Sequence, residues 1–178
     1  MKVLVLSIGN VLFGDEGVGV HFTNYMKLNY KLRGENSLEF VDGGTLAMSL
    51  TPIIAEFDKV LVIDCIDADN AEVGDVYYFN YLDMPNRISW HGSAHEVETL
   101  QTLNSMEILG DLPDTQILGV VPKRIEPMTF ELSSEILSAV PIMEKTTLKF
   151  LETFGFKGEK ISNFSLQDIA YKHEKGEI

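Results

Sequence analysis

The beginning of the chain constrains the fold most. An apolar run at residues 3–6 leads into a turn in which four glycines fall within eleven residues, from Gly9 to Gly19. A pattern of helical period follows the turn. Glycine allows a backbone to bend tightly and to be approached closely. The opening is therefore a buried strand, a tight turn and a helix.

The rest of the chain repeats this alternation. Apolar runs at 38–41, 59–63 and 116–122 are separated by segments of helical period at about 47–57, 93–109 and 133–155. Continuous apolar runs are typical of parallel strands buried on both faces. We predict an α/β three-layer sandwich, with a mostly parallel twisted sheet of about five strands and helices on both faces. Residues 75–82 alternate and predict an edge strand.

The domain organisation follows from the length. We expect residues 1–155 to form a single domain, and residues 156–178 to be a C-terminal tail or a short appended helix. Arg33 and Gly34 should end the first helix. His21 and His173 have no acidic cluster near them in this layout and are predicted on the surface.

The charge balance limits the partners. The chain has 14 Lys and Arg against 27 Asp and Glu, a net charge of −13, which argues against nucleic-acid binding. The single cysteine, Cys65, excludes an intrachain disulfide and fits a reducing compartment. No apolar run is long enough to span a bilayer. We expect a cytoplasmic monomer.

The glycine-rich turn does not fit a phosphate site. It matches neither the dinucleotide fingerprint nor the P-loop, and two acids, Asp15 and Glu16, stand where the helix opens. A carboxylate at a helix N-terminus is favoured by about 0.3–1 kcal/mol and would compete with a bound anion. A serine elbow is also absent, and Cys65 lies in an apolar, acidic stretch that disfavours a thiolate.

Acids and histidines follow several of the predicted strands. They are Asp15, Glu16, Asp42, Asp64, Asp67, His91 and His95. Ligands of parallel sheets bind at the carboxyl ends of the strands, so these side chains should converge on one edge. Oxygen and imidazole donors suit nickel or zinc, and a neutral His95 is favoured in the first turn of its helix. Taken singly, each residue has a structural alternative: Asp15 caps a helix, Asp42 closes a turn, Asp64 binds loop amides and the histidines lie on loops.

Four short motifs resemble those of the hydrogenase maturation endopeptidases, in order and across about residues 1–155. These proteases trim the C-terminus of the nickel–iron hydrogenase large subunit. The first motif is Gly9-Asn10-x-Leu12-x-Gly14-Asp15-Glu16-x-x-Gly19. The others are residues 42–45, residues 62–64 and residues 119–122 with Glu126-Pro127.

The resemblance implies a site and a substrate. It carries both the metal-binding and the catalytic role onto Glu16, Asp64 and His95, with Asp15 as a helix cap or a support behind them. Ser93-Ala94-His95 fits the family's Ser-x-His, and Ser89-Trp90-His91 is the competing match. Nickel would arrive with the substrate, a nickel-loaded large-subunit precursor. The family is often grouped with the aspartic proteases, although no paired Asp-Thr-Gly is present here.

Some residues depart from the family pattern. Ala47 replaces a glycine, and Glu96 and Glu98 stand where glutamine and glycine are usual. These changes concern the surface that would face the substrate rather than the metal ligands. Two other functions stay open from the residues alone: a non-catalytic module that binds a metal or small ligand, and a general metallohydrolase with its own ion.

Overall fold

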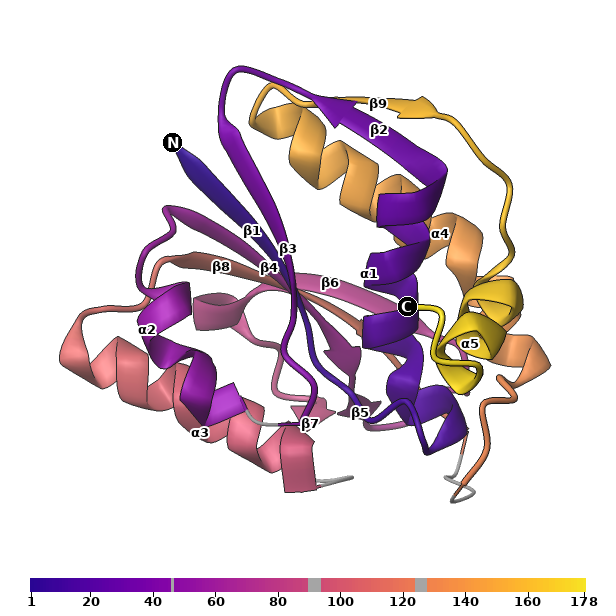
Figure 1. The fold of residues 1–178 in the computed structure, drawn as a ribbon. Helices are drawn as coiled ribbons and strands as arrows, with labels where there is room; N and C mark the ends of the chain where they lie inside the picture. The colour runs from indigo at the N-terminus through magenta and orange to yellow at the C-terminus, as the bar shows by residue number, and fades with distance from the viewer. Residues whose placement is uncertain (46, 90–93, 124–127) are drawn as a thin grey trace.

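The computed structural model describes residues 1–45, 47–89, 94–123 and 128–178 (Figure 1). The strands are β1 (Lys2–Ser7), β2 (Tyr30–Arg33), β3 (Ser37–Asp42), β4 (Lys59–Cys65), β5 (Asp67–Ala68), β6 (Val76–Asn80), β7 (Ile88–Ser89), β8 (Asp114–Val120) and β9 (Lys157–Lys160). The α-helices are α1 (Val18–Asn29), α2 (Thr51–Ile54), α3 (Ala94–Leu109), α4 (Ser134–Thr153) and α5 (Leu166–Glu174). Short 3₁₀ helices are η1 (Gly14–Gly17), η2 (Ala47–Leu50) and η3 (Tyr81–Asp83).

Five strands form the main sheet, in the order β3-β1-β4-β8-β6. The first four are parallel to one another, and β6 is an antiparallel edge strand. The two central strands, β1 and β4, are almost completely buried, which explains why both read as continuous apolar runs. The predicted fold class and the predicted edge strand are confirmed.

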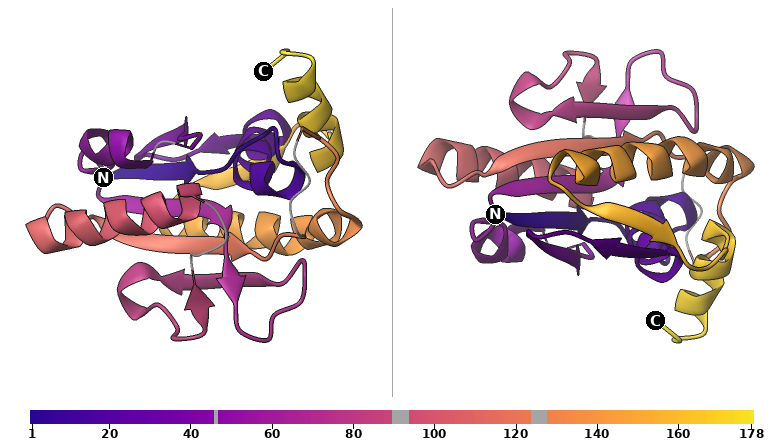
Figure 2. Two further views of the ribbon diagram at one scale, coloured as in Figure 1. Left: turned by 90° about the horizontal axis from the view of Figure 1, so that it is seen from below. Right: turned by 90° about the horizontal axis from the view of Figure 1, so that it is seen from above.

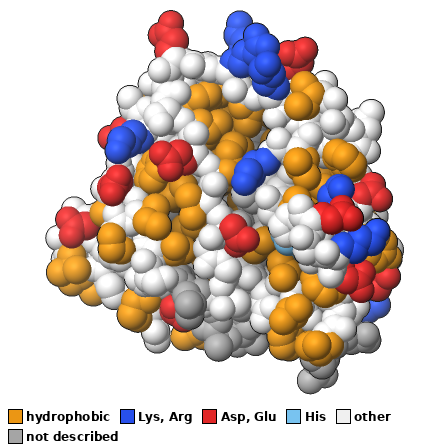
Figure 3. Space-filling model, in the orientation of Figure 1, with side chains coloured by type: hydrophobic (Ala, Val, Ile, Leu, Met, Phe, Trp, Pro, Cys, Tyr) orange, Lys and Arg blue, Asp and Glu red, His pale blue; other side chains and the backbone are white. Residues whose placement is uncertain are grey.

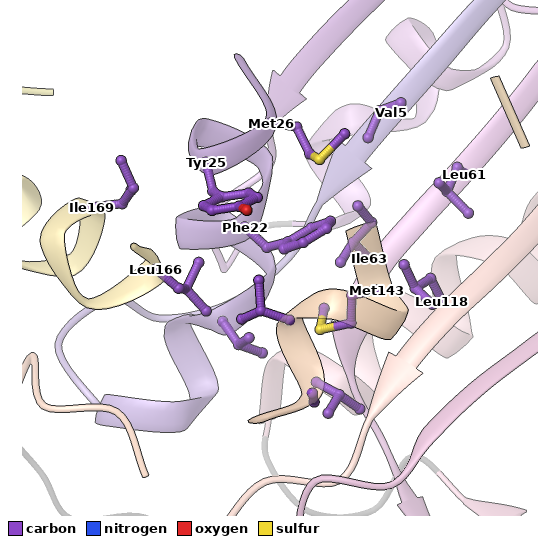
Figure 4. Packing of buried hydrophobic residues seen from close by; sticks show 14 of the residues in the cluster. Val5, Phe22, Tyr25, Met26, Leu61, Ile63, Leu118, Met143, Leu166 and Ile169 are labelled. Atoms are coloured by element: carbon purple, nitrogen blue, oxygen red, sulfur yellow. The ribbon is translucent and has the colours of Figure 1, made fainter. Parts of the chain in front are cut away.

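Alternate residues of the central strands face two separate hydrophobic cores. Val3 and Val5 pack with α1, α4 and α5, whereas Leu4 and Leu6 pack with α2 and α3. Figure 4 shows the first core, with Phe22 of α1 set between the strands and Met143 of α4. Helices therefore cover both faces of the sheet, as the alternation predicts.

The C-terminal segment folds back onto the domain. β9 pairs antiparallel with β2, and α5 lies beside α1 (Figures 1 and 2). Leu166, Ile169 and Ala170 of α5 are buried in the first core. In both views of Figure 2, α5 lies on the side of the molecule opposite the segment that contains β6 and η3.

Two predicted helices are shorter than their patterns indicate. The first helix ends at Asn29, because residues 30–33 form β2 and pair with β9, a partner more than a hundred residues away. The helix expected at 47–57 is only η2 followed by α2. The chain leaves it to enter β4, and the carboxylate of Asp58 accepts a 2.7 Å hydrogen bond from the backbone N–H of Lys2. None of the helices in the described ranges is both long and apolar enough to cross a membrane.

Candidate functional site

The loop after β1 is closed by a backbone hydrogen bond to Glu16. The N–H of Asn10 donates to the carbonyl oxygen of Glu16 at 3.2 Å. A Cβ atom on Gly9 would lie 2.3 Å from that same oxygen, so only glycine fits there. The glycine that follows β1 therefore allows the loop to close against the turn that carries Glu16.

The start of α1 lies directly across the ends of two strands. A Cβ atom on Gly19 would lie 2.4 Å from the carbonyl oxygen of Ile8 and 2.5 Å from that of Ile63. Because Gly19 has no side chain, the helix can pack directly against the ends of β1 and β4. The chain enters this helix through η1, so Glu16 lies at the carboxyl edge of the sheet.

Asp64 lies at the same edge. It is the penultimate residue of β4, the strand beside β1, and its side chain is fully buried, as that of Glu16 nearly is. One carboxylate oxygen of Asp64 accepts a 2.8 Å hydrogen bond from the N–H of Cys65. The structure therefore brings Glu16 and Asp64 to one edge, as the sequence predicts. Two buried acids at one edge of a sheet are costly unless compensating charge or hydrogen-bond donors reach them.

Asp15 does not cap α1, so of the two roles predicted for it, helix cap or support behind the ligands, the first is wrong. The residue at the cap position is Gly17, and Asp15 lies two residues earlier in η1. Its buried carboxylate accepts hydrogen bonds from the N–H groups of Lys123 and Ser133, both at 2.8 Å, and from the Ser133 hydroxyl at 2.7 Å. Asp15 therefore ties the loop after β8 and the start of α4 to the turn that carries Glu16.

The structure predicts a clear result for Asp15→Asn. The Asn side chain has no charge, and its N–H₂ group would face one of the three donors that now bind the carboxylate. We therefore expect a loss of about 2–3 kcal/mol in the free energy of unfolding. Urea denaturation measures it, with Asp111→Asn as the control because Asp111 is exposed. Equal stability of the two variants would contradict the role assigned to Asp15.

The loop after β3 is joined to the loop after β1. The N–H of Gly9 donates to the carbonyl of Gly44 at 2.9 Å, and the N–H of Gly43 donates to that of Ser7 at 2.8 Å. Asp42 closes its own turn by accepting from the N–H of Gly44 at 2.9 Å, which is the structural alternative considered for it. Asp42 is thus assigned to a turn.

The predicted histidine ligand, His95, belongs to α3, a helix on one face of the sheet. His95 is the second residue of α3, and its side chain lies outside what the structure describes. His91 and Ser93 also fall outside the described residues. One turn further along α3, the Glu98 carboxylate accepts from the N–H of Met48 at 3.0 Å, which attaches the start of this helix to the segment after β3. In the described part of the chain, no three His, Cys, Asp or Glu side chains are gathered as a metal site.

Comparison with known proteins identifies the chain's relatives. The family model for hydrogenase maturation protease matches residues 20–150. The chain belongs to this family. It is therefore a hydrogenase maturation protease, and the resemblance seen in the four sequence motifs is confirmed.

Individual relatives agree over most of the chain. Protein HydD of Wolinella succinogenes is 44% identical over 158 residues, which cover 88% of this chain and 99% of HydD. The hydrogenase 2 maturation protease of Escherichia coli is 28% identical over 128 residues, or 71% of this chain and 77% of that protein. The solved structure of the E. coli maturating endopeptidase HybD has the same fold, with a TM-score of 0.79 over 90% of this chain and 98% of HybD, at 24% identity.

Two histidines of this maturation protease are not where the sequence predicts them. His21 is fully buried and His173 is half-buried, and their Nδ1 atoms lie 2.8 Å apart. Burial, with a smaller contribution from the charge of His173, lowers the pKa of His21 to about 3. Burial also lowers the pKa of His173. No local pattern indicated this pair, because the two histidines are 152 residues apart in the sequence.

Proposed function

We propose that this protease removes the C-terminal peptide of a nickel-loaded nickel–iron hydrogenase large-subunit precursor and recognises the nickel through Glu16, Asp64 and His95. Membership in the family supports the reaction class over a non-catalytic binding module. The observation that carries the proposal is the placement of two buried carboxylates at one edge of the sheet, Asp64 in β4 and Glu16 in η1, which contacts β4.

The donor set fits nickel brought by a substrate. Two carboxylate oxygens and one imidazole nitrogen are donors that a divalent nickel ion accepts. His95 lies in the first turn of α3, where the helix dipole favours the neutral imidazole that can bind a metal. Three ligands from the protease leave the other coordination positions to the precursor.

The reaction itself is one hydrolysis. Water adds to the carbonyl carbon of the scissile peptide bond, the C–N bond breaks, and the new amine takes up a proton as the C-terminal peptide leaves. Contacts from Glu16 and Asp64 to nickel would hold the precursor in one orientation, which places its scissile bond at the same edge of the sheet. A precursor without nickel would lack these contacts and bind more weakly.

The surroundings of Glu16 suit a protein substrate better than a small molecule. The N–H of Thr129 donates to the carbonyl of Leu12 at 3.1 Å, and the N–H of Gly14 donates to that of Thr129 at 2.8 Å. This joined pair of loops exposes two apolar side chains, with 41% of Leu12 and 79% of Met128 accessible. Hydrophobic side chains gather over the loop that follows β1 at the lower right of Figure 3. An exposed apolar surface beside the site favours a protein partner over the general metallohydrolase reading.

A processing assay tests this function. The precursor of a large subunit is purified with and without nickel, incubated with the protease, and examined by gel shift and by mass spectrometry of the released peptide. We expect cleavage of the nickel-loaded form and at least about tenfold slower cleavage of the nickel-free form, since each lost coordinate contact weakens binding. Equal cleavage of both forms would overturn nickel recognition, and cleavage of neither would overturn the assigned substrate. The cytoplasmic location and the monomeric state stay predictions.

A further inference from the structure

His21 fills the space beside the turn that carries Glu16. It lies in the first turn of α1, and a Cβ atom on Gly17 would come within 2.8 Å of its Nε2 atom. Gly17 is the residue directly after Glu16. The imidazole ring therefore packs against the end of η1 and limits where that turn can lie.

Hydrogen bonds connect His21 to His173 and Asn24. The side-chain N–H₂ of Asn24 donates to the carbonyl of Val20 at 3.2 Å and lies 3.3 Å from Nε2 of His173. The Nδ1 atoms of His173 and His21 lie 2.8 Å apart, so the two rings share one hydrogen bond. Nε2 of His21 is the nitrogen that faces Gly17, and it has no hydrogen-bond partner among the described residues. Polar contacts thus run from Asn24 through His173 to His21.

The helix α5 reaches the same turn by a second route. The Gln167 side chain accepts from the N–H of Leu132 at 2.9 Å and donates to the carbonyl of Phe130 at 3.0 Å. The next residue, Ser133, binds the carboxylate of Asp15 through both its N–H and its hydroxyl. Thus α5 holds η1 from one side through His21 and from the other through Ser133 and Asp15.

A separate pair of bonds attaches α5 to the body of the protein. The Asn29 side chain donates to the carbonyl of Phe164 at 3.0 Å and accepts from its N–H at 2.8 Å. Leu166 and Ile169 are buried against α1. Because these contacts involve neither His173 nor Gln167, α5 should remain docked when those two side chains are changed.

We infer that the C-terminal helix α5 positions Glu16, with His173 and Gln167 as the positioning residues. The inference goes beyond the proposed function, since it assigns a role to a segment that lies after the residues matched by the family model. It rests on the proposed function only in taking Glu16 as a residue that contacts the substrate. His173 and Gln167 act through other residues and need not touch the substrate.

The test compares four variants of the full chain. His173→Ala and Gln167→Ala each remove one route, and the double variant removes both. His173→Asn keeps a hydrogen-bonding group near the position of Nδ1. Glu174→Ala is the control, because Glu174 is the exposed neighbour of His173 on the same helix. Hydrogen exchange of the amides of Gly14–Gly17 is measured together with kcat and KM on nickel-loaded precursor.

We expect the double variant to exchange the amides of η1 on the order of tenfold faster and to lose on the order of tenfold in kcat, with a smaller change in KM. His173→Asn should restore most of the loss seen with His173→Ala, and the control should match the original protein. Unchanged exchange in η1 in a folded double variant would overturn the inference, as would His173→Asn being as impaired as His173→Ala. The exchange measurement needs no substrate, so failure of the proposed function and failure of this inference are distinguishable.

Discussion

Glu16→Gln and Asp64→Asn should each lower kcat/KM for nickel-loaded precursor by about 10- to 100-fold. Each change keeps the shape of a buried side chain and removes one negative charge from the proposed ligand set. Interactions with a charged partner contribute about 1.5–3 kcal/mol, which corresponds to that range of rates. Because both residues would bind one ion, the double variant should lose less than the product of the single losses.

The control for these variants is Asp111→Asn, an exposed acid between α3 and β8, which should process precursor at the original rate. Thermal unfolding of each variant shows whether a lower rate comes from the missing carboxylate or from a less stable fold. If both Glu16→Gln and Asp64→Asn cleave nickel-loaded precursor as fast as the original protein, the ligand assignment is wrong.

Acid should weaken the folded state through His21 in particular. Burial lowers its pKa to about 3 in the folded protein, against 6.5 for a histidine exposed to water. Below pH 6.5 this histidine is therefore protonated in the unfolded chain but stays neutral in the folded chain. The free energy of unfolding falls as the pH drops toward 3. At about 1.4 kcal/mol per pH unit, lowering the pH from 6.5 to 4.5 should cost about 2–3 kcal/mol through this residue. Above about pH 7.5 the contribution no longer changes, because the histidine is then neutral in both states.

Urea unfolding at the two pH values measures this effect. In His21→Gln the difference between pH 6.5 and pH 4.5 should shrink by about 2–3 kcal/mol, whereas Glu174→Gln should leave it unchanged. His21 faces His173 of α5, and the charged form of His173 is favoured by a hydrogen bond to the backbone of Ile169 and by the carboxylate of Asp42. An identical pH dependence in His21→Gln and the original protein would contradict the burial argument.

The sequence predicts those parts of the fold that depend on local pattern. Strands β1 and β4 can be predicted from the sequence, because strands buried on both faces need uninterrupted apolar side chains. The convergence of Glu16 and Asp64 is predictable for the same reason, because parallel strands end at one edge of a sheet. The four motifs support this prediction, because they follow the predicted strands in the same order as in the family.

Contacts between distant residues could not be predicted in this way. The carboxylate of Asp15 is bound by Ser133, 118 residues further along, and a local cap was the natural prediction for an acid at that position. Tyr30 continues a helical pattern but pairs with Lys160 in a two-stranded sheet. In each case a tertiary partner overrides the local preference.

The docking of α5 has a consequence for the order in which the protein is made. The turn that contains Glu16 is synthesised before the α-helices of the described chain, whereas α5 is the last of the described elements to be synthesised. The contacts from His173 to His21 and from Gln167 to Leu132 cannot form until every other element has left the ribosome. If α5 positions Glu16 as we infer, the turn that contains Glu16 is synthesised early but reaches its final arrangement only after α5 has left the ribosome.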